Sequence, residues 1–486
     1  MRTQTTSIKH IGFILGPLFF LLILLLFPKD LISPHAGKVL AVAAWMVTWW
    51  VTEAVAIPAT ALLPLILFPF LGVMKMNAAA APYANPIIFL FMGGFMIALA
   101  LEKHRLHERI ALALIKITGT SGDGIILGFM LATGFISMWI SNTATAMMML
   151  PIAASVINLL KKEGTQTLHD LSKKERNFAL GLMLMVGYAA TMGGLGTIIG
   201  TPPNVVFAGL LDSFYHQKLD FGKWMLVGVP VTIALLFSTY LLITKILFPN
   251  HIAQVQGSDE LIRSRMKELG PLRHEEKLVL IIFALTSFFW IFQQYINYLI
   301  GHEMLNDTNV AMAGGLLMFI TPVNFKNLTF LLEWKDTQKM PWGILILFGG
   351  GLGLANGLEA VGIIQLIGGW IADQSTFNGW LIFTLITVTV ILSEFMSNVA
   401  LVQIFIPVVF GIADGLKVNP ILLAMPVTLG ASIGFMFPVA TPPNAIVFSS
   451  GYIRVRDMIR AGSVLDIVSI LIILLASVTL IAWVYG

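Results

Sequence analysis

The sequence contains few charged residues and no cysteine. Of its 486 residues, 11% are charged and 57% are hydrophobic, whereas soluble domains carry about 25% charged residues. The mean hydropathy is +0.88, and long apolar runs recur along the chain, which is typical of a polytopic membrane protein. The lack of cysteine excludes disulfides, thiolate catalysis and cysteine-ligated metals.

Sequence patterns of enzymes and ATP-driven pumps are also missing. There is no Ser/His/Asp arrangement, no metal-binding histidine cluster and no Walker-type glycine loop, so we assign no catalytic residue and do not expect an enzyme. The net charge of +4 is better interpreted through its distribution along the chain than as a sign of nucleic-acid binding. We therefore expect no nucleic-acid partner.

The apolar runs predict an all-α polytopic membrane protein with about eleven transmembrane helices and two re-entrant helical hairpins. The first run, 11–27, lacks a small-residue cleavage site and is interpreted as a retained span rather than a signal peptide. The hairpins are expected near 123–160 and 379–412. The spans are expected near residues 11–27, 37–52, 54–72, 85–101, 178–212, 223–248, 276–300, 309–322, 340–358, 419–450 and 462–485.

Basic residues support this layout, with the N-terminus in the cytoplasm. The cytoplasmic segments then hold most of the 29 lysine and arginine residues, as the positive-inside rule requires. This group includes Lys103, Arg105, Arg109, Lys161, Lys162, Lys173, Lys174, Arg176, Arg263, Arg265, Lys267, Arg273, Arg454, Arg456 and Arg460. Segment 103–117 has a basic face and an apolar face, so it is expected to lie along the inner membrane surface or to continue as a solvated helix.

Two motifs occur twice, in the same order. Ser141-Asn142-Thr143-Ala144 and Ser397-Asn398-Val399-Ala400 each lie at the centre of a predicted hairpin. Each is followed, within apolar sequence, by Thr-Pro-Pro-Asn, at 201–204 and again at 441–444. Helix breakers at matching points of two halves indicate a transporter's central binding site.

The duplication predicts two repeats of five crossings each, and an odd number of crossings makes the second inverted relative to the first. Residues 1–36 form an N-terminal segment with the first span, and 37–248 form the first repeat with hairpin 123–160. Residues 249–275 are a cytoplasmic linker, and 276–486 form the second repeat with hairpin 379–412.

The motif residues suit a site that holds an anion and a cation together. At each hairpin turn a new helix begins, and its first amide groups and positive dipole end attract an anion. A proline pair frees upstream carbonyls, which with serine and asparagine oxygens make an all-oxygen site for a small cation such as Na⁺. A dianion and cations can share a low-dielectric midplane where either alone would be very unfavourable.

These residues resemble the divalent anion–sodium symporter family, the sodium-coupled di- and tricarboxylate and sulfate carriers. The resemblance covers nearly the whole chain and includes both Ser-Asn motifs, both Thr-Pro-Pro-Asn motifs, and the segment 49–58 with sequence WWVTEAVAIP. It implies an elevator-type transporter that forms a homodimer, with Na⁺ as coupling ion.

The resemblance also implies site residues. The first sodium site would be formed by Ser137, Ser141, Asn142 and Gly200, and the second by Ser393, Ser397, Asn398 and Ala440. The substrate would contact Ser141, Asn142, Thr143, Ser397, Asn398, Thr441 and Pro442, with Val399 beside them. Bacterial dicarboxylate members of the family often have Ser-Asn-Thr in both hairpins, so Val399 removes a hydroxyl group from the expected anion site.

We therefore expect a sodium-coupled secondary transporter in the inner (cytoplasmic) membrane that imports a C4-dicarboxylate such as succinate. The alternatives within transport are sulfate or citrate as substrate, and an exchanger of two dicarboxylates. An anion channel would need a continuous polar pathway, which the few charges disfavour. A membrane scaffold or receptor would have no need of duplicated cation sites.

Overall fold

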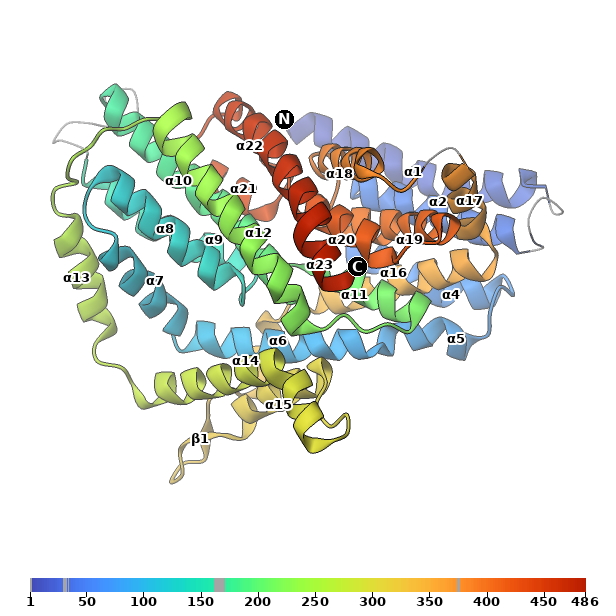
Figure 1. Cartoon of the computed structure of the whole chain (residues 1–486), viewed down its shortest axis with the longest axis horizontal. Coiled ribbons are helices and arrows are strands. Elements are labelled where there is room, and N and C mark those ends of the chain that lie inside the picture. Colours follow the sequence, from blue (N-terminus) through green and yellow to red (C-terminus); the bar gives the residue numbers. More distant parts are fainter. Residues whose placement is uncertain (1, 29–32, 34, 161–170, 374–375) are drawn as a thin grey trace.

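Helices form almost all of the described chain (Figure 1). The computed structural model describes residues 2–28, 33, 35–160, 171–373 and 376–486. Lys161 and Lys162, expected at the cytoplasmic surface, lie outside the described residues. The first half contains α1 (Arg2–Leu26), α2 (Ala36–Thr52), α3 (Ile57–Thr60), α4 (Leu63–Phe70), α5 (Met76–Ala80), α6 (Pro86–Lys103), α7 (Leu106–Ile117), α8 (Gly122–Ser137), α9 (Asn142–Asn158), α10 (Lys173–Gly193), α11 (Pro202–Tyr215) and α12 (Phe221–Leu241).

The second half begins with the segment between the predicted repeats. This half contains α13 (Ser258–Leu269), α14 (His274–Ile300), α15 (Asp307–Ile320), β1 (Pro322–Asn324), β2 (Thr329–Phe330), α16 (Trp342–Ala360), α17 (Ile363–Asp373), α18 (Gly379–Ser393), α19 (Asn398–Leu416), α20 (Pro420–Ala431), α21 (Pro442–Ser449), α22 (Val455–Ala476) and α23 (Ala482–Tyr485). The two short strands pair in antiparallel orientation, and they lie at the lower edge of the molecule in Figure 1.

The all-α polytopic prediction is confirmed. Among the described residues, 8 helices are long and apolar enough to cross a membrane, and the shorter apolar helices include α2, α15 and the first arm of each predicted hairpin. Both hairpins are present as helix–turn–helix units, α8 with α9 and α18 with α19. The count of about eleven spans and the inverted layout stay predictions.

Three local features differ from the sequence-based expectation. The predicted span 54–72 is not one helix, because Pro58 and Pro64 each start a new short helix, α3 and then α4. Helix α17 and the β1–β2 hairpin were not predicted, because each follows an apolar helix after only a few residues. In the structure α17 packs along α19.

Helix α10 is the most fully buried of the candidate membrane spans in the described chain. In the most apolar stretch of Lys173–Gly196 every residue is buried, whereas in the corresponding stretch of Ile8–Leu26 only 11% of the residues are buried. Around α10 lies the larger of two hydrophobic clusters, which both hairpins join. The smaller cluster is built by α2, α4 and α16, and Ala400 near the tip of the second hairpin belongs to it.

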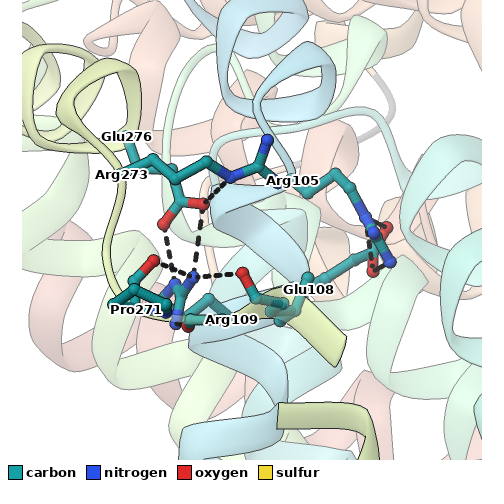
Figure 2. A network of polar contacts seen from close by, with 8 residues as sticks. Arg105, Glu108, Arg109, Pro271, Arg273 and Glu276 are labelled. Carbon is teal, nitrogen blue, oxygen red and sulfur yellow. Dashed lines mark hydrogen bonds and ion pairs between the residues drawn. The ribbon is translucent and has the colours of Figure 1, made fainter. Parts of the chain in front are cut away.

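The segment between the halves is fixed to α7 by a buried ion pair (Figure 2). Arg109 on α7 donates from Nε to Glu276 at 2.8 Å, and the Glu276 side chain is 1% exposed. The same guanidinium donates to the carbonyl oxygens of Leu269, Gly270 and Pro271 at the end of α13. One side chain therefore holds α7, α13 and the start of α14 together.

Replacing Arg109 is expected to destabilise the protein. Arg109→Ala leaves the buried Glu276 with the exposed Arg273, at 3.4 Å, as its ion-pair partner, so the cost is expected to be below the roughly 3–5 kcal/mol of a buried charge left unpaired. Arg263→Ala is the matched control, because its pair with Asp259 is exposed and is worth about 0.5 kcal/mol or less. Thermal unfolding in detergent measures both variants. Equal unfolding temperatures for the two would contradict a structural role for the Arg109 pair.

Candidate functional site

Each hairpin tip is the N-terminal end of its second helix. Ser141 is the N-cap of α9, and its hydroxyl oxygen accepts a hydrogen bond from the Ala144 amide at 3.3 Å. Ser397 takes the same place before α19, but its side chain forms no cap hydrogen bond. The Ser141 hydroxyl therefore satisfies its own helix end, whereas the first amides of α19 have no side-chain cap.

Four oxygen atoms converge beside the first tip. The buried Ser137 hydroxyl donates to the Ala190 carbonyl at 2.6 Å and lies 2.7 Å from Asn142 Oδ1. The Asn142 amide atom that faces Ser137 also lies 3.1 Å from the Ala190 carbonyl oxygen and 3.2 Å from the Gly200 carbonyl oxygen. Carbonyl oxygens repel an amide oxygen, so this arrangement needs either a cation among them or an amide rotated to present Nδ2.

Two glycines allow these oxygens to approach one another. A Cβ atom on Gly200 would lie 2.5 Å from the Gly194 carbonyl oxygen, and one on Gly194 would lie 2.6 Å from Asn142 Oδ1. No side chain fits at either position. The structure therefore brings together Ser137, Asn142 and Gly200, and it places beside them the Ala190 carbonyl, which the sequence analysis missed.

The second cluster is similar but not identical. The buried Ser393 hydroxyl contacts the carbonyl oxygens of Val390, at 2.8 Å, and Ile433. A Cβ on Gly434 would lie 3.1 Å from the side chain of Ala440 and 3.4 Å from Ser393 Oγ. Asn398 Oδ1 is buried and has no hydrogen-bond partner among the described residues. Ser393 and Ala440 thus lie together, and Asn398 holds an unsatisfied oxygen.

Both Thr-Pro-Pro-Asn motifs end an unwound segment in the same way. Asn204 Nδ2 donates to the carbonyls of Gly194 at 3.1 Å and Thr197 at 2.9 Å. Asn444 Nδ2 donates to Gly434 at 2.9 Å and Phe437 at 3.1 Å. The sequence analysis expected free carbonyls upstream of the prolines, and it missed that the motif's own asparagine binds two of them.

Further contacts recur in the two halves. The Trp224 indole donates to the Leu195 carbonyl at 3.0 Å, and the Tyr188 hydroxyl donates to the Phe435 carbonyl at 2.9 Å. Gly228 on α12 and Gly462 on α22 each lie against an unwound segment. A Cβ atom on Gly228 would lie 2.7 Å from the Leu195 carbonyl oxygen, and one on Gly462 would lie 2.3 Å from the Phe435 carbonyl carbon. Each segment is thus held by an aromatic donor and a glycine contact.

The halves differ in how the tip is joined to the unwound segment. In the first half the Thr197 hydroxyl donates to the Met138 carbonyl at 2.5 Å. In the second half the buried Glu394 carboxylate accepts from the amides of Phe435 at 2.6 Å, Met436 at 3.0 Å and Phe437 at 3.2 Å. A carboxylate therefore organises the second segment without being a member of the predicted ligand set.

The predicted substrate residues lie on helices that pack across the halves. Helix α9, which begins at the first tip, packs against α21, and α19 packs against α11. Thr441 is buried and its hydroxyl caps α21, while Pro442 is exposed. Thr143 and Val399 are half-buried, and Val399 touches both hydrophobic clusters. The meeting of both tips around one anion stays a prediction.

Comparison with known proteins identifies relatives along the full chain. Residues 8–485 match the family described as the sodium:sulfate symporter transmembrane region. A sodium-dependent dicarboxylate transporter, SdcS, from Staphylococcus saprophyticus is 41% identical over 482 residues, covering 98% of this chain and 92% of that protein. SdcS from Staphylococcus aureus is 40% identical over 481 residues, covering 96% and 90%.

Two solved structures share the fold at low identity. The Alcanivorax borkumensis YdaH transporter aligns with a TM-score of 0.56 and 13% identity over 86% of this chain and 89% of its own. Neisseria gonorrhoeae MtrF, described as representing a class of antimetabolite efflux pumps, aligns with a TM-score of 0.53 and 13% identity over 85% and 83%. At this identity the likeness concerns the fold alone.

Glu394 is expected to hold the second unwound segment. In Glu394→Gln one carboxylate oxygen becomes an amide that cannot accept from the Phe437 N–H, which costs about 1–3 kcal/mol. Hydrogen exchange should quicken in residues 432–441 and stay unchanged in 194–201, which Thr197 holds. Glu303→Gln, at an exposed loop residue, is the control. Unchanged exchange at 435–437 would show that the carboxylate does not anchor this segment.

Proposed function

The chain belongs to the sodium:sulfate symporter family, and from that premise we propose that it imports a C4-dicarboxylate such as succinate together with Na⁺. The relatives at about 40% identity are sodium-dependent dicarboxylate transporters and are matched over nearly their whole length. They are transporters rather than enzymes, and Na⁺ is the coupling ion. The protein is a multi-pass membrane protein, which we place in the cytoplasmic membrane with its N-terminus inside.

One observation carries the cation part of this proposal. One terminal atom of the Asn142 amide lies 2.7 Å from Ser137 Oγ, 3.1 Å from Ala190 O and 3.2 Å from Gly200 O, where an amide oxygen is favourable only with a cation among these oxygens. A monovalent cation bound among them would make ligands of the Asn142, Ala190 and Gly200 oxygens, which otherwise repel one another, and of the Ser137 hydroxyl oxygen. The set is neutral and entirely oxygen, which fits Na⁺ and offers no nitrogen or sulfur to a softer metal.

The proposed cation ligands are those that the family resemblance implies, with one addition. The first site comprises Ser137, Ser141, Asn142 and Gly200, and the carbonyl of Ala190 supplements it. Ser141 would contribute through its backbone, because its hydroxyl oxygen accepts from Ala144 N. The second site comprises Ser393, Ser397, Asn398 and Ala440, of which Asn398 Oδ1 is unsatisfied among the described residues.

The anion would bind between the N-terminal ends of α9 and α19. We propose contacts from Ser141, Asn142, Thr143, Ser397, Asn398, Thr441 and Pro442. The lack of a side-chain cap at Ser397 supports this, since it leaves amide donors of α19 for a carboxylate. Val399 offers no hydroxyl, so the two ends of a dicarboxylate would meet unequal numbers of donors.

Coupling would arise because Asn142 and Asn398 each serve both ligands. An asparagine amide has an oxygen that can bind the cation and a nitrogen that can donate to a carboxylate. When Na⁺ holds Oδ1, Nδ2 is turned away from the oxygen cluster and toward the tip. Without Na⁺, Nδ2 is drawn to the oxygens of Ala190, Ser137 and Gly200, and the amide presents an oxygen to the anion instead.

The domain organisation is part of the same proposal. Residues 37–248 and 276–486 would be inverted repeats joined by the linker 249–275, with 1–36 as the N-terminal segment. The recurring contacts of Asn204 and Asn444 support this division. We further propose transport by an elevator movement in a homodimer. The separate cluster of α2, α4 and α16 is consistent with a second packed body beside the hairpins.

Uptake into proteoliposomes tests the function. Radiolabelled succinate should accumulate under an inward Na⁺ gradient with more than first-order dependence on Na⁺, and choline should not replace Na⁺. Unlabelled malate should compete more strongly than sulfate or citrate. Equal uptake in Na⁺ and choline would refute sodium coupling, and preferential competition by sulfate would replace the dicarboxylate with sulfate as substrate.

Asn142→Ala and Asn398→Ala are each expected to reduce succinate transport severely. A hydrogen bond to a charged ligand is worth about 1.5–3 kcal/mol, which corresponds to about 10- to 150-fold in affinity. The control is Asn356→Ala, which loses a hydrogen bond from Ser213 at 2.7 Å away from both unwound segments. The measurement is the Na⁺ and succinate dependence of uptake at matched protein content. Wild-type uptake by either tip variant would remove that residue from the site.

A further inference from the structure

A basic cavity lies at one end of the helix bundle, away from both hairpin tips. Its volume is about 420 Å³, and it is bounded by the start of α10, the end of α12 with residues 246–249, and the start of α22. Its charged lining residues are Lys173, Arg176, Arg454, Arg460 and one acid, Asp457. Three elements far apart in sequence thus place positive charge around one hollow.

These positive charges form no direct ion pair in the part of the chain that the structure describes, although Asp457 lines the same cavity. None of Lys173, Arg176, Arg454 and Arg460 takes part in an ion pair there, although Arg460 lies over the Phe248 ring at 5.9 Å from its centroid. Elsewhere arginine side chains such as Arg105 and Arg109 are paired. Four basic residues against one acid, Asp457, leave an excess of positive charge around the cavity, which a bound anion would neutralise.

Arg454 stands at an unfavourable place for its charge. It is the N-cap residue of α22, and it forms no side-chain cap hydrogen bond. A positive charge at a helix N-terminus opposes the helix dipole, although Asp457 in the first turn of α22 favours it. The comparable helix α12, whose Gly228 contacts the other unwound segment as Gly462 does on α22, begins instead with Asp220, which caps Lys223 N at 2.7 Å. The fold therefore does not require a basic residue at this helix start.

One wall of the cavity is apolar, and its outer residue is exposed. Ile246, in the segment that follows α12, lines the cavity and is 65% exposed, whereas Leu247 is half-buried and Phe248 is buried. A phosphate group would suit the basic wall, since arginine binds phosphate oxygens in a bidentate manner. Acyl chains would suit the apolar wall. Juxtamembrane basic clusters of this kind attract anionic lipids.

We propose that this cavity binds the phosphate group of an anionic phospholipid headgroup at the membrane surface. The phosphate lies among Arg176, Arg454 and Arg460, and it balances the positive charge that Asp457 alone does not offset. The lipid's chains continue past Ile246 into the bilayer. A free phosphate could satisfy the same arginines, but it would leave the apolar wall exposed.

The test uses the full chain in neutral detergent with phosphatidylglycerol, phosphatidylcholine or inorganic phosphate as probe. The cavity variant is Arg176→Gln with Arg454→Gln. The matched control is Lys174→Gln with Arg456→Gln, which removes the same charge from neighbouring exposed positions on the same two helices that do not line the cavity. Native mass spectrometry measures lipid binding, and thermal unfolding measures stabilisation by each probe. A single Arg460→Gln variant provides a milder change.

We expect phosphatidylglycerol to bind the cavity variant about 30-fold more weakly than the wild type, from two lost basic groups near the surface. The control should bind within about twofold of wild type, and Arg460→Gln should lie between. Phosphatidylcholine should bind the wild type more weakly than phosphatidylglycerol does, and it should not raise the unfolding temperature of the protein. Stabilisation by inorganic phosphate but not by phosphatidylglycerol would assign the cavity to a free phosphate and overturn the lipid. Equal losses in cavity and control variants would overturn a specific site.

Discussion

The need to satisfy backbone polar groups where the chain unwinds inside the membrane is the constraint on which the rest of this structure depends. Unsatisfied carbonyl and amide groups in hydrocarbon cost several kcal/mol each. Asn204 and Asn444 meet this need by binding two carbonyls apiece. Because those carbonyls are held, the remaining ones near Gly200 keep a defined direction toward Asn142. The asparagine of each Thr-Pro-Pro-Asn motif thus builds the site without having to touch the ligand.

Helix α10 contacts the first oxygen cluster in one half and the unwound segment of the other. It is buried along its length, its Ala190 carbonyl joins the first oxygen cluster, and its Tyr188 hydroxyl binds the Phe435 carbonyl of the second unwound segment. A displacement of α10 would therefore disturb both clusters at once. The basic cavity also begins at the first turn of α10, so one helix connects this cavity with the first oxygen cluster.

The two halves reach similar geometry with different chemistry. Thr197 joins tip and unwound segment by one neutral hydrogen bond, whereas Glu394 uses a carboxylate and three amides. Charge-assisted hydrogen bonds are about twice as strong as neutral ones, so the second segment is the more firmly held.

The sequence by itself determined the class, the two hairpins and the broken helices, because these depend on apolar run length and on where Pro, Gly and Asn interrupt a run. It also indicated Ser137, Asn142 and Gly200 as neighbours through the family resemblance. Only the tertiary structure decided that Ala190 joins them, that Glu394 binds amides of residues 435–437, and that Arg176 and Arg454 share a cavity. These contacts join segments far apart in the chain, and no local periodicity encodes which carbonyl or charge a distant helix will meet.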